Sequence, residues 1–352
     1  MKEAHVSPDT SVQIVDSAVP QPGPEEVLIK VVCAGCNPKD WKYPHFSGVT
    51  INSGDDIAGF VERVGEEVYE FRPGDRVAAF HQMRVGGGAF AEFAIAPAST
   101  TFHIPEKISF EEASTVPLAA LTAAVALYHN LKLPLPWEPA KEKIPLLIYG
   151  GSSAIGSFAI KLARRSNIHP IIAVAGKSKD YVESLLDPSQ GDAVIDYRDG
   201  IDAVVFGIQQ ALKAADAGSA FHAFDAISEK NTFHALSKAL DPIGHITLVL
   251  LESNYTSIPE SIRTSLTFVG IVHTGPPPLD PKQGVRYVAE GNGRDFGFVF
   301  SRLIGRAMQE GWLSGHPQEV VPGGLSGLST ALNNLKAGKA NAVKYVIKPV
   351  DT

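Results

Sequence analysis

The pattern of hydrophobic and polar positions changes near residue 110. Before that point, short β-branched and apolar runs at residues 26–33, 57–65, 71–80 and 86–95 are separated by turns rich in glycine and proline. Such runs, with turn residues between them, are typical of β-strands. No sustained helical period is expected in this part of the chain. The pattern therefore predicts a compact, irregular β-domain.

After residue 110, strands and helices alternate. Residues 110–131 have a helical pattern, and a proline-rich loop follows them. The next predicted strands are residues 146–149, 170–175, 193–197, 220–226, 245–250 and 266–273, and the predicted helices among them are residues 154–166, 181–186, 202–215 and 233–240. Apolar strands joined by crossover helices indicate a parallel sheet that is covered on both faces. We therefore predict an α/β fold with a doubly wound sheet of the dinucleotide-binding type.

The last part of the chain lacks this alternation. It contains two predicted helices, residues 296–310 and 325–337, and one predicted strand, residues 342–347. We expect this tail to pack on the N-terminal β-domain and to leave a cleft between two domains. Two domains agree with the length of 352 residues, at about 150 residues per domain. The predicted domains are residues 1–112 with 280–352, and residues 113–279.

Composition and charge exclude several classes of protein. Hydrophobic residues make up 44% of the chain and charged residues 20%, as in an ordinary globular protein. The net charge of −7, without a basic run, argues against a nucleic-acid or membrane partner. The longest nearly apolar stretch, residues 113–128, is shorter than the ~18 residues of a membrane span, and the N-terminus has no apolar signal segment. We therefore predict a cytoplasmic enzyme that acts on a small molecule.

The strongest local motif is a strand, a turn of small residues and a helix. The turn reads Gly-Gly-Ser-Ser-Ala-Ile-Gly at residues 150–156. The N–H groups and the dipole of a helix N-terminus bind a pyrophosphate, and small residues allow its close approach. Compared with the pattern G-x-G-x-x-G, Ser153 replaces the middle glycine and adds a hydroxyl donor. A turn without a ligand is the alternative. The residues predicted to bind the cofactor here are Gly151, Ser152, Ser153, Ala154 and Ile155.

The end of the second predicted strand indicates which dinucleotide binds. Enzymes that use NAD place an acidic residue there, to accept a hydrogen bond from the ribose 2′-hydroxyl. This chain has Gly-Lys-Ser-Lys at residues 176–179, and no acid before Asp180. A 2′-phosphate needs positive charge and hydrogen-bond donors. We therefore predict NADPH as the cofactor, held by Lys177, Ser178 and Tyr197, with a solvated lysine turn as the alternative.

The two cysteines of the chain, Cys33 and Cys36, form a Cys-x-x-Cys motif. A structural zinc site needs four ligands, and the chain has no second cysteine pair. A redox motif of this kind usually opens a helix, whereas this one ends a strand-like run. We therefore predict two small, partly buried thiols in a reducing compartment, and a redox or metal-binding pair is the alternative.

Several further motifs resemble one known superfamily. They are Asn-Pro-Lys-Asp-Trp-Lys at residues 37–42, Gly-Asp-Asp-Ile-Ala-Gly at 54–59, Phe-Arg-Pro-Gly-Asp-Arg-Val at 71–77 and Gly-Gly-Ala-Phe-Ala-Glu-Phe at 87–93. Their order resembles the medium-chain dehydrogenase/reductase superfamily, which has a GroES-like domain, a Rossmann domain and a return to the first domain. The whole chain is similar to its zinc-free branches, and most similar to fungal trans-acting enoyl reductases and quinone oxidoreductase-like enzymes.

The resemblance also bears on zinc. Zinc alcohol dehydrogenases of this superfamily carry Gly-His-Glu where this chain has Gly-Asp-Asp at residues 54–56, and residues 116–120 hold no Cys, His or acid at the place of another ligand. We therefore predict no metal, with Cys36, His45 and His81 as an alternative ligand set. Without a Lewis acid, alcohol oxidation is disfavoured. Reduction of a C=C bond conjugated to a carbonyl needs only a hydride at the β-carbon, a donor to the enolate oxygen and a proton at the α-carbon.

The remaining site residues come from this resemblance and from the rule that strand ends face the cofactor. The resemblance implies that Thr122 faces the nicotinamide and favours a cofactor contact for Asn37. For Asp40 and Lys42 the preferred role is an ion pair that anchors their loop, or a cofactor contact, and Lys42 as a proton donor is the alternative. The predicted catalytic residues are thus Lys42 and Thr122, and the further predicted cofactor contacts are Asn37, Asp40, Leu250, Ile271, Val272, Val343 and Lys344.

Together these features predict an NADPH-dependent, zinc-independent reductase of activated C=C bonds, of the enoyl or enone type, in secondary metabolism. An NADPH:quinone oxidoreductase is the first alternative, since it uses the same hydride geometry. A nucleotide-binding protein without catalysis, like the structural crystallins of the superfamily, is the second. The expected substrate is an enone, an enoyl thioester or a quinone, either free or bound to a carrier protein. The chain is expected to be a monomer or a homodimer.

Overall fold

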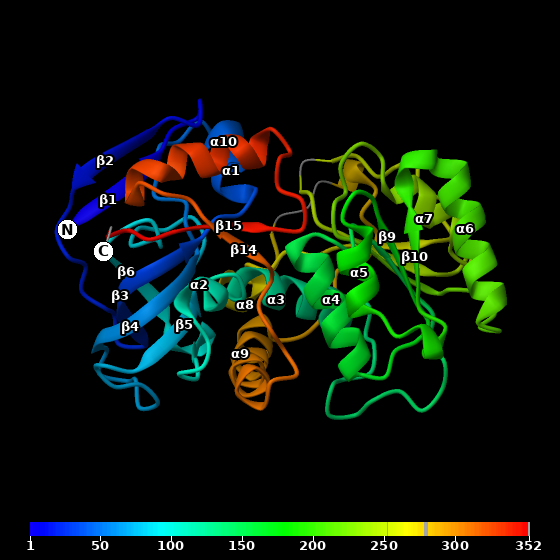
Figure 1. The fold of residues 1–352 in the computed structure, drawn as a ribbon, viewed down its shortest axis with the longest axis horizontal. Helices are drawn as coiled ribbons and strands as arrows, with labels where there is room; N and C mark the ends of the chain where they lie inside the picture. Colours follow the sequence, from blue (N-terminus) through cyan, green and yellow to red (C-terminus); the bar gives the residue numbers. More distant parts are fainter. Residues whose placement is uncertain (252, 278–280, 351–352) are drawn as a thin grey trace. The chain divides into compact units, whose positions relative to one another are not determined.

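The computed structural model describes residues 1–251, 253–277 and 281–350 (Figure 1). The chain divides into two compact units. The first unit contains Met1–Ala119, Val272–Thr274 and the chain from Gly293 onward. The second unit contains Ala120–Ile271 and Gly275–Asn292. The domain boundary predicted between residues 279 and 280 lies outside the described residues.

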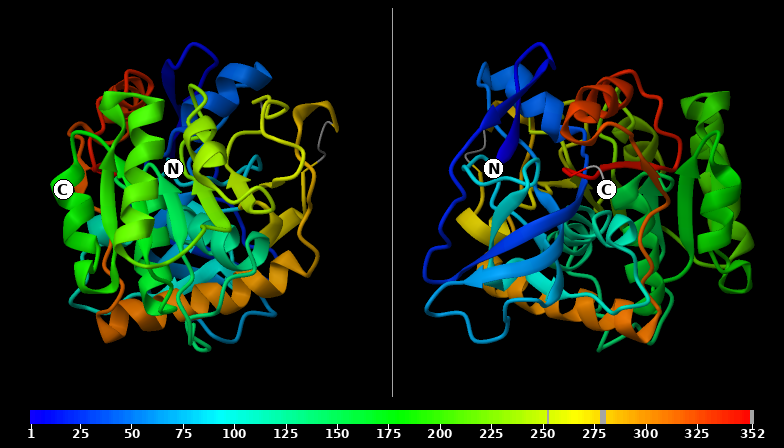
Figure 2. Two further views of the ribbon diagram at one scale, coloured as in Figure 1. Left: turned by 90° about the vertical axis from the view of Figure 1, so that its right-hand side faces the viewer. Right: turned by 60° about the vertical axis from the view of Figure 1, so that its left-hand side comes forward.

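The first unit is built on a seven-stranded sheet with the order β14-β15-β3-β4-β5-β7, in which β6 also pairs with β3. A separate hairpin forms a two-stranded sheet (Figures 1 and 2). The strands of the unit are β1 (Lys2–Val6), β2 (Val12–Asp16), β3 (Glu26–Gly35), β4 (Asp56–Val64), β5 (Arg76–Phe80), β6 (Phe93–Pro97), β7 (Thr101–His103), β14 (Gln318–Val320) and β15 (Lys344–Ile347).

The last strand of the chain pairs with the centre of this sheet. β15 lies antiparallel to β3, with Val346 opposite Gly35 and Ile347 opposite Ala34. The helices of the tail are α9 (Gly293–Glu310) and α10 (Leu328–Lys336), and buried side chains of α10 join the core formed by β3 and β4. The tail therefore completes the sheet that the N-terminal strands begin.

One helix of the first unit was not predicted. Helix α1 (Lys39–Ser47) begins after Pro38 and ends at Gly48, whose φ of 72° allows the chain to turn away. The prediction of a β-domain without a sustained helical period therefore overlooks this short helix. The pattern is missed because the helix has only nine residues, includes Pro44, and buries only Asp40 and Pro44. A single turn of buried residues gives no apolar period to detect.

The second unit has the predicted parallel sheet. Its strand order is β10-β9-β8-β11-β12-β13, the order of a doubly wound sheet. The strands are β8 (Leu146–Tyr149), β9 (Ile171–Ala175), β10 (Ala193–Asp196), β11 (His222–Asp225), β12 (His245–Leu248) and β13 (Arg263–Leu266), and the helices include α4 (Ala154–Arg165), α5 (Lys179–Leu185), α6 (Ile201–Ala214) and α7 (Phe233–Ala239). Apolar side chains of α6 and α7 pack on one face of the sheet, against Leu147, Ile172 and Ile246.

The predicted sixth strand is wrong. Residues 266–273 are apolar, but β13 (Arg263–Leu266) comes earlier, and Ile271–Thr274 forms the short helix α8. The edge strand has a polar sequence because its side chains find partners: the Thr264 hydroxyl donates to the Gly284 carbonyl, and Ser265 contacts His245. Polar residues with such partners carry no apolar strand signal.

The helical stretch around residue 120, Phe110–Asn130, is longer than the apolar run of residues 113–128 recognised in the sequence. It comprises α2 (Phe110–Ala113), α3 (Pro117–Ala124) and a π-helical turn, Val125–Asn130. Among the described residues, Phe110–Asn130 is one stretch long and apolar enough to cross a membrane by length and composition, but 83% of it is buried inside the protein. It is therefore a core helix.

Candidate active site

The turn after β8 has the geometry of a phosphate-binding loop. Gly150 adopts a φ of 80°, and α4 begins at Ala154. Ser153 caps the helix, because its hydroxyl oxygen accepts a hydrogen bond from the N–H of Gly156 at 3.0 Å. The N–H groups of Ala154 and Ile155, in the first turn of α4, have no acceptor within the helix and point out of its N-terminal end. They form a cradle for an anion.

The loop requires glycine at 150, where φ is 80° and a Cβ would lie 2.5 Å from Ile227, and at 156, and it leaves little room for a side chain at 151. A Cβ on Gly156 would lie 2.2 Å from the carbonyl oxygen of Gly150, so only glycine allows helix and strand to approach this closely. A Cβ on Gly151 would meet Ala173 and Val182 of the neighbouring elements. Ser152, Ser153, Ala154 and Ile155 are partly exposed, whereas Gly151 and Gly156 are buried. The loop therefore presents small, accessible groups at the carboxyl end of the sheet.

The predicted 2′-phosphate residues lie at the ends of the next two strands. Lys177 is exposed and Ser178 is partly exposed after β9. The ring of Tyr197 is 46% exposed and lies so close to Gly176 that a Cβ there would be 2.6 Å from the ring. The neighbouring Lys179 pairs with Glu183 at 3.4 Å. Among the described residues of this turn, Lys177 is therefore the lysine that is available to bind a phosphate. These residues fit a dinucleotide with a 2′-phosphate.

The predictions at the later strand ends need correction. β12 ends at Leu248, so Leu250 lies in the following turn, where its carbonyl accepts a hydrogen bond from the Tyr255 hydroxyl at 2.7 Å. Ile271 and Val272 begin α8 and do not end a strand. The strand-end argument therefore does not apply to these three residues. The apolar sequence at 271–272 was misleading because Ile271 and Val272 are buried in α8 as they would be in a strand.

The carboxylate of Asp56 contacts two of the predicted site residues of the first unit, Asn37 and Lys344. It accepts hydrogen bonds from the side-chain amide of Asn37 at 2.8 Å and the N–H of Leu118 at 2.7 Å, and it pairs with the Lys344 ammonium at 2.5 Å. Asp56 is fully buried, and Lys344 is 3% exposed. The contacts of Asn37 and Lys344 with Asp56 thus connect three segments of the chain. Val343, just before β15, packs partly buried against the core.

Next to this cluster, Lys39 holds two buried carboxylates together. Its ammonium lies 2.9 Å from Asp40, pairs with Asp55, and donates to the carbonyl of Ser53. Burial raises the pKa of Asp40 to about 7 and that of Asp55 to about 6, although Lys39 acts against this shift. The carboxylates in turn raise the pKa of Lys39, against the effect of its burial.

The anchoring ion pair therefore differs from the one predicted. Asp40 pairs with Lys39, and the ammonium of Lys42 lies 5.8 Å from the centre of the Trp41 ring. Lys39 is the first residue of α1, so its side chain reaches the start of β4, where Asp55 lies. Lys39 was missed although a signal was present: Asp55 and Asp56 stand side by side at the start of an apolar strand, and buried acids need a nearby cation.

The alternative zinc ligands are not brought together. Among the described residues, no group of three or more His, Cys, Asp and Glu side chains could hold a metal ion. His45 contacts the Pro8 carbonyl at 3.0 Å, and His81 contacts the Ile95 carbonyl at 2.6 Å. Burial also raises the pKa of Cys36 well above its usual value.

The two cysteines are fully buried, more completely than the partial burial that was predicted. Cys33 accepts a weak hydrogen bond from the Ser114 hydroxyl at 3.5 Å, and burial raises its pKa to about 12. A thiol with so high a pKa is a poor nucleophile and a poor ligand at neutral pH.

Thr122, the other predicted catalytic residue, lies in α3 and is 6% exposed.

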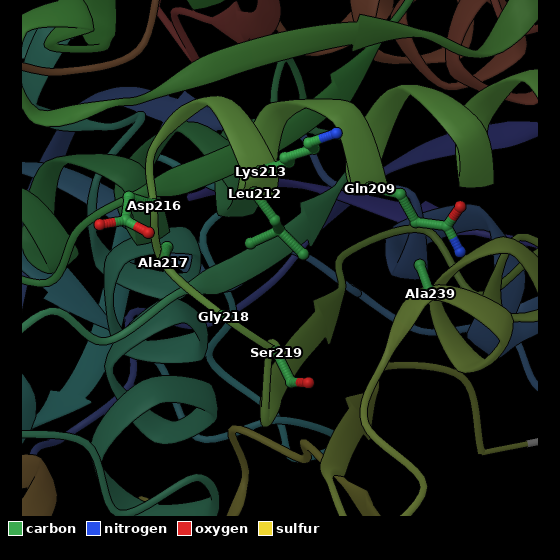
Figure 3. A pocket seen from close by; sticks show the side chains of 8 residues that line it. All are labelled: Gln209, Leu212, Lys213, Asp216, Ala217, Gly218, Ser219 and Ala239. Atoms are coloured by element: carbon green, nitrogen blue, oxygen red, sulfur yellow. The ribbon is translucent and has the colours of Figure 1, made fainter.

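A surface hollow of about 410 Å³ lies elsewhere in the second unit. It is formed by the end of α6 and the loop that leads into β11, and Lys213, Asp216 and Ser219 line it (Figure 3). This loop enters the sheet at the amino ends of the strands, whereas the phosphate loop leaves at their carboxyl ends. The hollow is therefore separate from the candidate cofactor site.

Comparison with known proteins agrees with this geometry. Residues 23–106 match the family model of the alcohol dehydrogenase GroES-like domain. The trans-enoyl reductase fsr4 of Gibberella fujikuroi is 46% identical over 329 residues, which cover 92% of this chain and 91% of that protein. The chloroplastic quinone-oxidoreductase QR1 of Triphysaria versicolor is 35% identical over 194 residues, 52% of this chain and 56% of that protein.

Solved structures show the same fold. An alcohol dehydrogenase superfamily protein from Novosphingobium aromaticivorans aligns over 100% of both chains, with a TM-score of 0.76 and 22% identity. The mycobacterial protein Rv1454c, in complex with NADPH, aligns over 99% of this chain and 100% of its own, with a TM-score of 0.71 and 21% identity. The chain therefore belongs to the medium-chain dehydrogenase/reductase superfamily, and within it to the family of the trans-enoyl reductases.

The predicted family and fold class are thus confirmed: a GroES-like domain is combined with a Rossmann sheet. The protein is an oxidoreductase of small molecules, and its family implies a nicotinamide cofactor.

Proposed function

We propose that this protein is an NADPH-dependent, zinc-independent reductase of enoyl C=C bonds that are conjugated to a carbonyl, and that it acts in secondary metabolism. The observation that carries the proposal is the 46% identity to a trans-enoyl reductase over nine-tenths of the chain. The cradle at the N-terminus of α4 supports it, because it fits the diphosphate of a dinucleotide.

The choice of NADPH rests on the turn after β9. Lys177 supplies a positive charge there, and Ser178 and Tyr197 supply hydroxyl donors. The first acid after the strand is Asp180, which lies within α5. A ribose 2′-phosphate gains charge-assisted hydrogen bonds from such a set, whereas a 2′-hydroxyl loses its usual acceptor.

Zinc independence is supported by the pairing of Lys39 with Asp55. The ammonium offsets part of the negative charge of the buried carboxylates Asp40 and Asp55, and their raised pKa values let protonation offset the rest, so that no metal ion is needed for charge balance. A conjugated C=C bond also needs less activation than an alcohol. The protein must then orient the cofactor and the substrate and deliver a proton.

The cofactor supplies a hydride for the β-carbon when it is bound. The chain must hold the dinucleotide at the phosphate loop and exclude water from the substrate. It must also deliver a proton to the α-carbon, a role that we assign to Lys42, and we assign the orientation of the nicotinamide to Thr122. Asn37 and Lys344 support the site through Asp56.

We further propose that the substrate is a thioester, presented free or on a carrier protein, and that the enzyme works in the cytoplasm as a monomer or a homodimer. The two buried thiols support a reducing compartment. A quinone reductase is the second candidate, favoured by the 35% identity to QR1 over half of the chain.

A substrate panel tests the proposal. NADPH consumption is measured with a 2-enoyl thioester of coenzyme A, with the same acyl group on a carrier protein, with a simple enone and with a benzoquinone. We expect consumption with the thioesters to exceed that with the quinone. Consumption with the quinone alone would establish the second candidate, and consumption with none of the four would favour a protein without catalysis.

A further inference from the structure

The loop that follows β11 has an unusual backbone. Ser228, Lys230 and Asn231 adopt φ values of 55°, 51° and 60°, in the left-handed region that non-glycine residues rarely occupy. Three such residues within four positions store strain, and strain persists only where the surroundings fix the conformation. Something in the structure must therefore hold residues 226–232 in place.

The fully buried carboxylate of Asp225 does so. One of its oxygens accepts hydrogen bonds from the N–H groups of Ile227 at 3.0 Å and Ser228 at 2.8 Å. The other oxygen accepts from the Thr232 hydroxyl at 2.6 Å, at the far end of the loop. Asp225 thus fixes both ends of the strained segment.

Ser228 extends this arrangement to the neighbouring strand. Its hydroxyl donates to the carbonyl of Asp225 at 3.0 Å and accepts from the N–H of Val249 at 3.0 Å. Val249 is the first residue after β12. The carboxyl ends of β11 and β12 are therefore joined through the loop.

The loop also borders the phosphate loop. The N–H of Ala226 donates to the carbonyl of Tyr149, the last residue of β8, at 3.1 Å. A Cβ on Gly150 would lie 2.5 Å from the side chain of Ile227, so Ile227 covers the first residue of the phosphate loop. A shift of Ile227 would therefore be felt at Gly150.

The order of the strands shows which part of a dinucleotide this loop would serve. β9 and β10 lie on one side of β8 and carry Lys177 and Tyr197, the residues proposed for the 2′-phosphate on the adenosine half. β11 and β12 lie on the other side of β8. Since a dinucleotide spans the point where the strand order reverses, its nicotinamide half lies over β11 and β12.

We propose that Asp225 is a positioning residue for the nicotinamide half of the cofactor, because it holds residues 226–232 against the phosphate loop and against the end of β12. This inference rests on the proposed function, in that it assumes a dinucleotide at the phosphate loop. Asp225 acts through the loop and needs no contact with the cofactor of its own.

The test compares two ligands on several variants. Adenosine 2′-monophosphate occupies only the adenosine half of the site and has no group on the phosphate loop, whereas NADPH occupies both halves and the phosphate loop. Asp225→Ala removes a few hydrogen bonds and should raise the Kd and the KM for NADPH by about tenfold or more, but should change the Kd of the monophosphate by less than about twofold. Asp225→Asn keeps an acceptor for both N–H groups and should restore most of the NADPH affinity.

The matched control is Asp192, a second buried acid of the same unit. It accepts hydrogen bonds from the N–H groups of Ile171 and Asp187, at the amino end of β9. Asp192→Ala should lower the Tm and leave both Kd values unchanged. If Asp225→Ala does not fold, Thr232→Val replaces it, because it removes one loop contact without opening a cavity, and it should show the same selective loss for NADPH.

Each outcome is decisive. Equal losses for the two ligands, or no loss for NADPH, would overturn the role of Asp225 while leaving the proposed function intact. Failure of Asp225→Asn to bind NADPH better than Asp225→Ala would also overturn it. A wild-type protein that binds neither ligand would instead contradict the proposed function itself.

Discussion

The ammonium of Lys39 pairs with the carboxylate of Asp55, which stands at the place of the histidine in the Gly-His-Glu motif that zinc alcohol dehydrogenases carry. The same ammonium pairs with Asp40, and both carboxylates are buried. A side chain of the protein thus supplies the positive charge of this region. This pairing has consequences for stability and for metal dependence.

Replacing Lys39 by methionine should destabilise the protein in a pH-dependent way. In the wild type, burial raises the pKa of Asp40 to about 7 and that of Asp55 to about 6, from 3.8. Between about pH 4 and pH 7 the folded protein therefore keeps protons that the unfolded chain has released, and stability falls as the pH rises. Without the ammonium the carboxylates must be buried unpaired at high pH, and the loss should reach about 3 kcal/mol at pH 8.

Urea unfolding at pH 5 and pH 8 measures this effect. The loss caused by Lys39→Met should be clearly smaller at pH 5, where protonation relieves the two acids. The control is Lys42→Met on the same helix, whose effect on stability should not depend on pH in this way. An equal loss from Lys39→Met at both pH values would mean that the pairing with Asp40 and Asp55 does not matter.

Chelation should leave the enzyme active. Prolonged dialysis against a strong chelator, followed by an assay with NADPH and an enoyl thioester, should give the untreated rate, because Lys39 already pairs with both buried acids. Metal analysis should find less than one zinc per chain. Activity that disappears with the chelator and returns with zinc would contradict the mechanism.

Lys177→Ala should change the preference between cofactors. The Kd for NADPH should rise by roughly 10- to 150-fold, which corresponds to a charge-assisted contact of about 1.5–3 kcal/mol, while the Kd for NADH should hardly change. The matched control is Lys179→Ala, two residues further on, since Lys179 is paired with Glu183. Similar losses for NADPH and NADH would show that Lys177 does not contact the 2′-phosphate.

Ala154→Glu should abolish cofactor binding without unfolding the protein. The new carboxylate would stand at the N-terminus of α4, where the diphosphate is proposed to lie, and charge repulsion and steric overlap should together cost several kcal/mol of binding. Ala154 is partly exposed, so the Tm of the cofactor-free protein should be nearly unchanged. Fluorescence titration with NADPH and a melting curve give the two values, and normal NADPH binding by the folded variant would place the cofactor elsewhere.

The phosphate loop could be predicted from sequence because its signal is local. Strand, turn and helix follow one another within 20 residues, and the glycines that the structure requires at 150 and 156 are visible in the chain. The parallel sheet could be predicted for the same reason, since β8 and β9 are continuous apolar runs.

The charge pairs could not be predicted in this way. Lys344 and Asp56 are 288 residues apart, and they meet only because β15 pairs with β3 in one particular register. Helix α1 and strand β13 were missed for a related reason: Pro44 and the polar residues of the edge strand weaken the local pattern, and tertiary partners stabilise them instead.

Isotope transfer tests directly whether hydride moves from NADPH to the C=C bond of an enoyl substrate. The protein is incubated with NADPH that carries deuterium at the transferable position of the nicotinamide and with a 2-enoyl thioester, and the product is analysed by mass spectrometry and NMR. The account predicts a saturated thioester with one deuterium at the β-carbon. Deuterium at the carbonyl carbon of an alcohol product, or oxidation of NADPH without deuterium in the acyl chain, would contradict it.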